Sequence, residues 1–246
     1  MASVAEPKKP WGPWLTLLFG VAIFIVYSTA QGLGLLPWVL VRAWAGASPQ
    51  ALQEAALTGM NLALATLVGC PVMLFICGLL AWARRGPDVA SYLAVRRPRL
   101  RSIVGWVSGI TVLAIGFSML NEGLHRPPPA FVVSSYATAG YLPLFWGAIA
   151  VCAPVAEEVL FRGFLFAGFA ASRLGTWGAL VLTSVLFALV HGGQYDWVDL
   201  TQVGLMGGCF GLARARTGSL VTSVSMHVTL NLIALALYHF ELNRDL

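Results

Sequence analysis

The sequence predicts an all-α protein, a polytopic transmembrane helical bundle of about seven spans, with eight as the alternative count. Hydrophobic residues make up 58% of the 246-residue chain and charged residues only 10%, whereas a soluble domain has about 25% charged residues. The apolar residues also form long segments, and a helix of about 20 such residues crosses a hydrocarbon core of about 30 Å. We therefore expect a multi-pass integral membrane protein in contact with the lipid bilayer.

The expected spans follow one another without a soluble domain or an internal repeat, so we predict a single membrane domain. The fifth and sixth spans have only about 15 residues each and are expected to be tilted or to lie where the bilayer is thinner. Residues 35–44, which contain Pro37 and two tryptophans, are expected at the outer membrane interface. The predicted spans are residues 14–34, 55–82, 103–120, 142–171, 177–191, 199–213 and 218–239.

The lysines and arginines between the spans predict the orientation, because positively charged loops stay on the cytoplasmic side. Only Arg42, Arg126 and Arg244 fall in outer loops, so the N-terminus is predicted to be cytoplasmic. A cleaved signal peptide is less favoured, because the first apolar run continues beyond Ala30. The compact size favours a bacterial cytoplasmic (inner) membrane. The cytoplasmic set is Lys8, Lys9, Arg84, Arg85, Arg96, Arg97, Arg99, Arg101, Arg173, Arg214 and Arg216.

The remaining composition argues against two other classes of protein. The net charge of +5 comes from the basic residues of these loops. The sequence has no basic patch interleaved with aromatic residues, so no nucleic-acid partner is expected. The cysteines have no paired spacing and all fall in apolar segments, so they predict neither a disulfide framework nor a zinc knuckle. They are Cys70, Cys77, Cys152 and Cys209.

The stretch VAEEVLFRGF, residues 155–164, places two glutamates and an arginine deep inside the fourth predicted span. A charged group at this depth is costly and usually has a partner in the bundle interior. Glu158 and Arg162 are four residues apart and share one side of a helix, where an ion pair can fix the packing. Glu157 points about 100° away from Glu158, and that ion pair does not explain it.

Two other predicted spans provide polar residues at a similar depth. Phe187 and His191 are four residues apart in the fifth span, and His227 and Asn231 have the same spacing in the seventh. At about 1.5 Å per residue, Glu158 and His191 lie about 21 Å from the predicted cytoplasmic end. Asn231 is expected at about 20 Å and His227 at about 14 Å. Each residue alone is more often a packing residue, but the shared depth predicts one buried site.

A carboxylate, two imidazoles and an amide at one buried site indicate hydrolysis. A carboxylate in a low-dielectric pocket has a raised proton affinity and, beside an imidazole, can take a proton from water. His and Asn donors can stabilise the oxyanion that forms when water attacks a peptide carbonyl. A divalent metal, zinc held by Glu157, His191 and His227, is an alternative source of activated water, although the His-Glu-x-x-His spacing is absent. A serine nucleophile in the same helices is a further alternative.

The three spacings resemble the motifs of the CAAX-protease and bacteriocin-processing family of intramembrane proteases, also called the CPBP or Abi family. The resemblance covers roughly residues 140–240. Residues 141–240 are therefore assigned to a CPBP/Abi-like catalytic core, and residues 1–140 to N-terminal transmembrane helices without an assigned role. Glu157, Glu158 and Arg162 match the Glu-Glu-x-x-x-Arg motif, Phe187 and His191 match Phe-x-x-x-His, and His227 and Asn231 match His-x-x-x-Asn.

The resemblance implies a CAAX prenyl protease-like endopeptidase that cleaves a membrane-proximal peptide or protein tail. It assigns water activation to Glu157 and His191, and oxyanion stabilisation to His227 and Asn231. Both a glutamate-dependent and a metal-dependent (metalloprotease-like) mechanism are consistent with it. Structural support is assigned to Glu158, Arg162 and Phe187.

Two other functions compete with a peptidase. Buried Glu and His residues also conduct protons in transporters and proton-relay proteins, but a relay needs polar residues along a path, whereas these gather at one depth. A non-catalytic immunity or scaffold bundle would not need a second carboxylate, Glu157, inside a membrane helix. The sequence therefore favours the peptidase.

Overall fold

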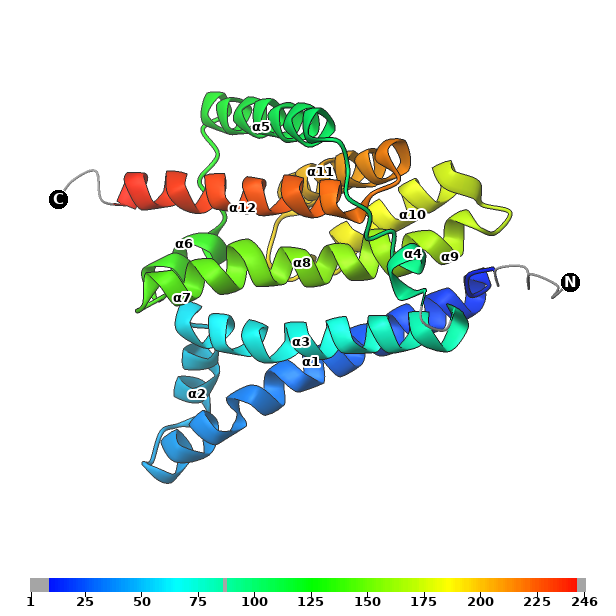
Figure 1. Ribbon diagram of the computed structural model, residues 1–246. Helices are drawn as coiled ribbons and strands as arrows, with labels where there is room; N and C mark the ends of the chain where they lie inside the picture. Colours follow the sequence, from blue (N-terminus) through cyan, green and yellow to red (C-terminus); the bar gives the residue numbers. More distant parts are fainter. Residues whose placement is uncertain (1–8, 86–87, 243–246) are drawn as a thin grey trace, which may run out of the picture.

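The computed structural model describes residues 9–85 and 88–242, and this part of the chain is helical without strands. Within these residues, seven long helical segments form the bundle, joined by turns and short helices (Figure 1). The short helices between segments are α2 (Pro49–Ala56), α4 (Val89–Tyr92) and α6 (Ala130–Ala137). The long segments are α1 (Pro13–Trp44), α3 (Gly59–Arg85), α5 (Leu100–Gly123), the run from α7 (Leu142–Trp146) to α9 (Phe166–Ala170), α10 (Gly175–Leu189), α11 (Trp197–Thr217) and α12 (Leu220–Leu242).

These helices confirm the predicted fold class, and each predicted span overlaps one long helical segment. Five of the described helices are long and apolar enough to cross a membrane by length and composition, while α10 is apolar but shorter. The sixth predicted span corresponds to α11, which is not among the five. The first helix continues through Pro37 to Trp44 instead of ending at residue 34. Proline is tolerated inside membrane helices more often than in soluble ones.

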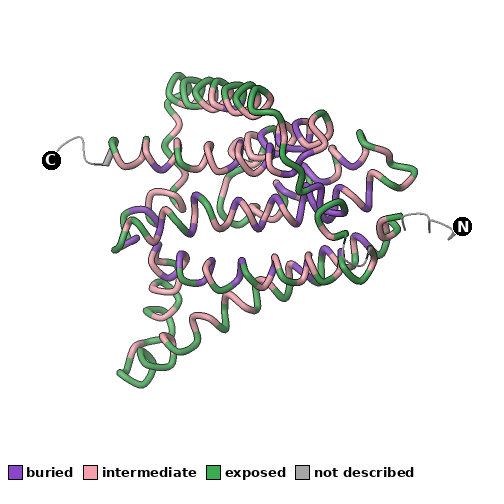
Figure 2. Tube along the Cα trace, viewed as in Figure 1, coloured by how far each residue is buried: buried purple, intermediate pink, exposed green. Residues whose placement is uncertain are grey.

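The outer surface of the bundle is apolar. Large side chains such as Leu18, Phe75 and Val112 are 60%, 69% and 69% exposed. Figure 2 shows that exposed residues dominate α1, α2 and α5, whereas buried residues are most frequent in the run from α8 to α9 and in α3. An apolar surface of this extent is unfavourable in water but suits contact with lipid. The chain is an integral membrane protein.

The helical run that contains the acidic pair is not a regular α-helix. It includes two π-helical stretches, η1 (Gly147–Cys152) and η2 (Val159–Leu165), with α8 (Ala153–Glu158) between them. Pro154 in the first turn of α8 lacks a backbone N–H, and in a regular helix its ring clashes with the carbonyl four residues earlier. The wider turn of η1 accommodates this proline. Such π-helical turns are rare and frequently occur at functional sites.

Basic residues gather at one end of the bundle. The ends of α3, α9 and α11 and the starts of α5 and α12 lie on the right of Figure 1, on the same side as the N-terminus. Arg84, Arg101 and Arg216 belong to these helix ends. Lys8 and Arg244, which also belong to the predicted loop charges, lie outside the described residues.

At the opposite end, Arg126 connects the segment after α5 to the start of α11. Its Nη2 lies 2.7 Å from Asp196 Oδ2 and 3.2 Å from Asp199 Oδ1. Asp196 is also the N-cap of α11 and accepts the backbone N–H groups of Val198 and Asp199 at 2.9 and 3.0 Å. The Asp199 N–H first, and then the Arg126 guanidinium, hold the pKa of Asp196 below its ordinary value of 3.8.

We expect the contribution of Asp196 to stability to disappear in acid. Because its folded-state pKa is lowered, the contribution is fully present above the ordinary value of 3.8 and is lost as the pH falls through the folded-state pKa. The thermal unfolding of wild-type and Asp196→Asn protein, compared from neutral pH into the acid range, measures it. The difference in Tm should shrink at the acid end, and a difference independent of pH would contradict this explanation.

Candidate active site

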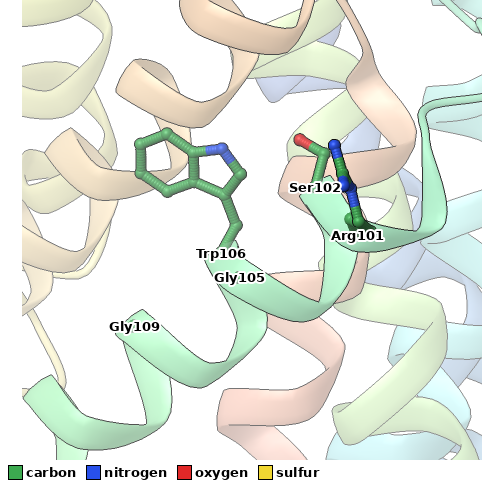
Figure 3. A pocket seen from close by; sticks show the side chains of 5 residues that line it. All are labelled: Arg101, Ser102, Gly105, Trp106 and Gly109. Atoms are coloured by element: carbon green, nitrogen blue, oxygen red, sulfur yellow. The ribbon is translucent and has the colours of Figure 1, made fainter.

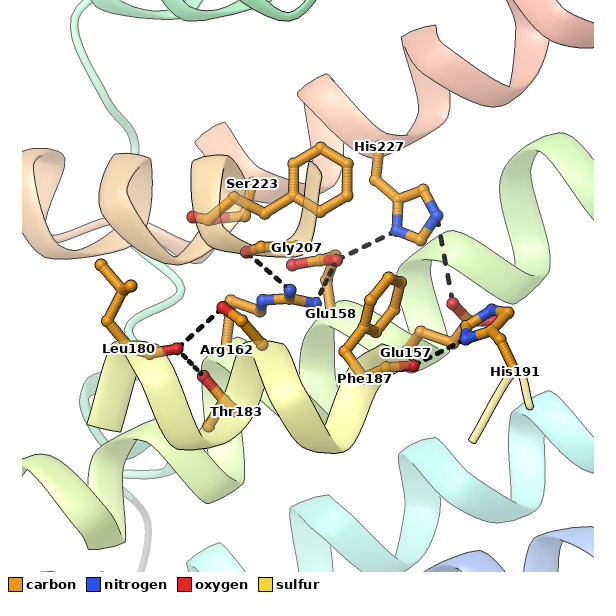
Figure 4. Close-up of polar contacts among 12 residues, drawn as sticks. Glu157, Glu158, Arg162, Leu180, Thr183, Phe187, His191, Gly207, Ser223 and His227 are labelled. Atoms are coloured by element: carbon orange, nitrogen blue, oxygen red, sulfur yellow. Dashed lines mark hydrogen bonds and ion pairs between the residues drawn. The ribbon is translucent and has the colours of Figure 1, made fainter. Parts of the chain in front are cut away.

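Glu158 and Arg162 form the predicted ion pair in the interior of the bundle. Arg162 Nη1 donates to Glu158 Oε1 at 2.9 Å, and both side chains are 0% exposed. Arg162 Nη2 donates to the Gly207 carbonyl of α11 at 2.8 Å, and its guanidinium carbon lies 4.5 Å from the centroid of the Phe187 ring. A buried charge is stable only when it is paired and hydrogen bonded. These contacts, drawn in Figure 4, explain how Arg162 is accommodated inside a membrane helix.

The arrangement requires glycine at position 207. A Cβ atom there would lie 2.8 Å from Arg162 Nη2 and 3.1 Å from Phe187 Cδ1. The small residues of α11 suggest close helix packing in general, but the sequence does not distinguish Gly207 from its neighbours. The structure gives it a specific role, because its backbone comes close enough to offer a carbonyl to the buried arginine.

Gly207→Ala is expected to lower the free energy of unfolding by about 1–3 kcal/mol, the usual cost of overpacking. The added methyl group would displace Arg162 or Phe187, and both are fixed by their other contacts. Thermal unfolding measures the loss. Gly208→Ala is the matched control, because its Cβ would approach only Ser184 Oγ, at 3.9 Å. Equal stability of the two variants would show that the close approach at Gly207 does not matter.

His227 of α12 lies between the two glutamates. Its Nδ1 is 3.0 Å from Glu158 Oε1, and its Nε2 is 4.0 Å from Glu157 Oε2. The imidazole stacks on Phe210 with a centroid distance of 4.9 Å. An ionised carboxylate can only accept hydrogen bonds, so Nδ1–H donates to Glu158. Nε2 is then an acceptor in the neutral ring or, in the imidazolium, a donor directed toward Glu157.

His191 lies just after α10, and its ring is oriented by the backbone. Its Nδ1 is 2.7 Å from the Phe187 carbonyl, which can only accept, so Nδ1 carries the proton and Nε2 is left as an acceptor. The Phe187 ring lies 4.8 Å from the His191 ring and 5.7 Å from the His227 ring, centroid to centroid. Figure 4 shows the Glu157 carboxylate directed toward these two imidazoles. Glu157 is 21% exposed, unlike its buried neighbour Glu158.

Asn231 lies one turn beyond His227 on α12, and its Nδ2 donates to the Ile149 carbonyl of η1 at 3.0 Å. The sequence predicted that Asn231, and not His227, lies at nearly the same membrane depth as Glu158. The structure instead brings His227 against Glu158, because the prediction assumed that all the helices begin in one plane. The other predicted residues lie in one region (Figure 4), whereas the hydrogen bond of Asn231 is with η1.

Two side chains near Glu157 have no counterpart in the predicted site. The Glu157 carboxylate acts electrostatically on the phenols of Tyr27, in α1, and of Tyr195, which precedes α11. Gln31 Nε2 donates to the Tyr27 hydroxyl at 2.9 Å. Burial, then the neighbouring Tyr238 and then Glu157, raise the pKa of Tyr195 to about 12. In the sequence, the polar Gln31 within an apolar span was the one indication that α1 contributes to the site. Only the fold shows that Tyr195 lies near Glu157.

The predicted zinc ligands do not form a metal-binding arrangement. Within the part of the chain that the structure describes, no three His, Cys, Asp or Glu side chains are placed to hold a metal ion. The side chains thus do not fit a three-residue zinc site as they stand, and the chemistry below uses only the protein's own groups.

Comparison with known proteins finds a protease family that this fold and site resemble. Residues 138–233 match the family model described as Rce1-like, type II CAAX prenyl endopeptidase Rce1-like. The matched segment contains all three motifs, so the resemblance to the CAAX-protease family is confirmed. This family implies a protease embedded in the membrane.

A second comparison finds a relative of unknown function. An uncharacterized 24.3 kDa protein of Escherichia coli is 27% identical over 163 residues, which cover 65% of this chain and 74% of that protein. No solved structure matches the chain significantly. The family match is therefore what connects the geometry of the site to an activity.

Proposed function

We propose that the protein is an intramembrane endopeptidase that hydrolyses a peptide bond in a membrane-proximal peptide or protein tail. The supporting observation is the position of His227, between Glu158 and Glu157. Arg162 neutralises Glu158 in the buried interior, whereas Glu157 is partly exposed and has no ion pair with Lys or Arg among the described residues. A packing brace requires Glu158 but not Glu157, so the second carboxylate is available for chemistry.

Glu157 and His191 activate water in this proposal. The Glu157 carboxylate accepts a proton from the water molecule, which the free Nε2 of His191 orients. The water oxygen attacks the carbonyl carbon of the substrate, and the electron pair of the double bond moves to the carbonyl oxygen. The electron pair of the oxyanion then re-forms the carbonyl, the C–N bond breaks, and Glu157 passes its proton to the leaving nitrogen. The products are a carboxylic acid and an amine.

His227 and Asn231 stabilise the oxyanion of the tetrahedral intermediate. Because Nδ1–H of His227 donates to Glu158, His227 can offer a second donor, Nε2–H, only as the imidazolium. Asn231 uses one amide hydrogen for the Ile149 carbonyl and has the other for the substrate. Glu158 therefore has two functions, as the partner of Arg162 and as the group that orients His227.

The same proposal places the N-terminus in the cytoplasm of a bacterium and the protein in its inner membrane. The basic ends of α3, α5 and α11 would then lie on the cytoplasmic side, as positively charged loops generally do. A peptide segment close to the bilayer is the substrate that a site enclosed by membrane helices can reach.

The proposal is tested with purified protein in lipid vesicles, incubated with a library of peptides that carry a hydrophobic anchor. Mass spectrometry identifies newly formed termini. We expect cleavage at internal peptide bonds, retained after exhaustive chelation. Cleavage that is lost after chelation and restored by zinc would transfer water activation to a metal. If the wild-type protein gives no termini beyond those in vesicles without protein, the peptidase is rejected, and if Glu157→Gln gives the same termini as the wild type, water activation by Glu157 is rejected.

A further inference from the structure

Two arginines outside the candidate active site are attached to the same turn at the basic end of the bundle. Arg96 lies in the connection between α4 and α5, and Arg214 in the last turn of α11. The Ser219 hydroxyl donates to the Arg96 carbonyl, and the Gly218 N–H donates to the Arg214 carbonyl at 3.0 Å. Both arginines are thus attached to the turn between α11 and α12.

Arg214 is held rigidly. Its Nε donates to the Arg162 carbonyl at 3.1 Å, and its guanidinium carbon lies 5.4 Å from the centroid of the Phe166 ring. Its terminal nitrogens have no hydrogen-bond acceptor among the described residues. Burial first, and then the positive charge of Arg96, lower the pKa of Arg214 to about 10.

The positive charge at this place is not compensated. Neither Arg96 nor Arg214 forms an ion pair with a carboxylate in residues 9–85 and 88–242. Two like charges that are close together, one of them partly removed from water, are unfavourable, and an anion placed between them offsets the cost. Within the described chain, the two terminal nitrogens of the planar Arg214 guanidinium remain free, and this edge matches the geometry of phosphate oxygens.

We propose that Arg96 and Arg214 bind the phosphate of an anionic phospholipid headgroup. Arg96 precedes the start of the α5 span at Leu100, and Arg214 precedes the start of the α12 span at Leu220, so both lie at the level of the headgroups. Basic residues just outside a membrane helix attract anionic lipids. The inference does not depend on the proposed peptidase activity.

A groove along α5 favours a lipid over a free phosphate ion. It has a volume of about 400 Å³ and begins at Arg101 and Ser102 (Figure 3), five and six residues after Arg96 in the sequence. It continues over Gly105 and Gly109 beside the Trp106 side chain. A Cβ at either glycine would meet nothing within 4 Å. Their small size is thus not required by packing within the described chain and leaves room for an acyl chain.

Thermal unfolding of the delipidated full-length protein in detergent tests this site with three probes: phosphatidylglycerol, phosphatidylcholine and inorganic phosphate. At about 100 times the Kd, we expect phosphatidylglycerol to raise the unfolding temperature by about 5–10 °C. The other two probes should give no resolvable rise. Arg214→Gln and Arg96→Gln should each lose most of the gain. Arg96→Gln keeps the Ser219 contact with its own backbone carbonyl, so it remains informative if Arg214→Gln does not fold.

Arg216→Gln is the matched control, because Arg216 is exposed in the same turn of α11. It should keep the full gain with phosphatidylglycerol. If Arg216→Gln lost as much of the rise in unfolding temperature as Arg96→Gln, the effect would be a general attraction between basic residues and anionic lipid, and the specific site would be overturned. An equal gain with phosphatidylcholine would also overturn it. An equal gain with inorganic phosphate would overturn the assignment to a lipid.

Discussion

Replacement of Glu157 by glutamine is expected to lower kcat/KM for peptide hydrolysis by about 10⁴-fold, the upper range for loss of a general base. Glutamine has nearly the same shape as glutamate but cannot accept the proton of the attacking water. Glu157 takes no part in the ion pair between Glu158 and Arg162, so the Tm of the variant should stay close to that of the wild type. The measurement is the cleavage rate of a peptide from the library, with Tm determined on the same preparation.

Glu122→Gln provides the control for this substitution. Glu122 is an exposed acid near the end of α5, and its replacement removes the same charge without touching the candidate active site. We expect wild-type rates from this variant. Substantial hydrolysis by Glu157→Gln would remove Glu157 from the mechanism, even if the protein proved to be a peptidase.

Arg162→Met is expected to have the largest effect on stability, about 3–5 kcal/mol. Methionine fills part of the space of the arginine but carries no charge. The buried Glu158 then keeps only its contact with His227. The Gly207 carbonyl also loses its hydrogen-bond donor. The cost is mainly that of an uncompensated buried charge. Denaturation by heat or by a denaturing detergent measures it, relative to the wild type under the same conditions.

The double variant Glu158→Leu/Arg162→Met separates the cost of breaking the pair from the value of the pair itself. A buried ion pair replaced by apolar residues of similar size is often neutral or stabilising. We therefore expect the double variant to recover much of the stability that Arg162→Met loses. It should not recover activity, because His227 has lost the carboxylate that orients it. A double variant less stable than Arg162→Met would show that Glu158 is not the source of the cost.

The composition and the length of the apolar segments were sufficient to predict the helical membrane fold, because the bilayer imposes both. The irregularities inside the segments could not be predicted in the same way. Pro154 marks the place where the fourth segment departs from a regular helix, but whether a proline produces a kink or a π-helical turn depends on packing. The continuation of α1 through Pro37 is a similar case.

The ion pair between Glu158 and Arg162 was predicted from helical spacing alone, because both residues lie on one helix and their geometry is local. Contacts between helices were not accessible in this way. The position of His227 against Glu158 depends on the relative height of α12, and the role of Gly207 depends on how closely α11 approaches Arg162. The proximity of Tyr27 to Glu157 depends likewise on the packing of α1, which lies outside the segment matched by the family model.

The dependence of a peptidase activity on Glu157 can be tested most directly in cells, where the substrate need not be identified beforehand. Membranes from cells that produce the wild-type protein are compared with membranes from cells that produce Glu157→Gln at the same level, and peptides near the membrane are identified by mass spectrometry. We predict a set of new peptide termini that is present with the wild-type protein and absent with the variant. Identical sets of termini in the two membranes, with both proteins folded, would contradict a peptidase that depends on Glu157.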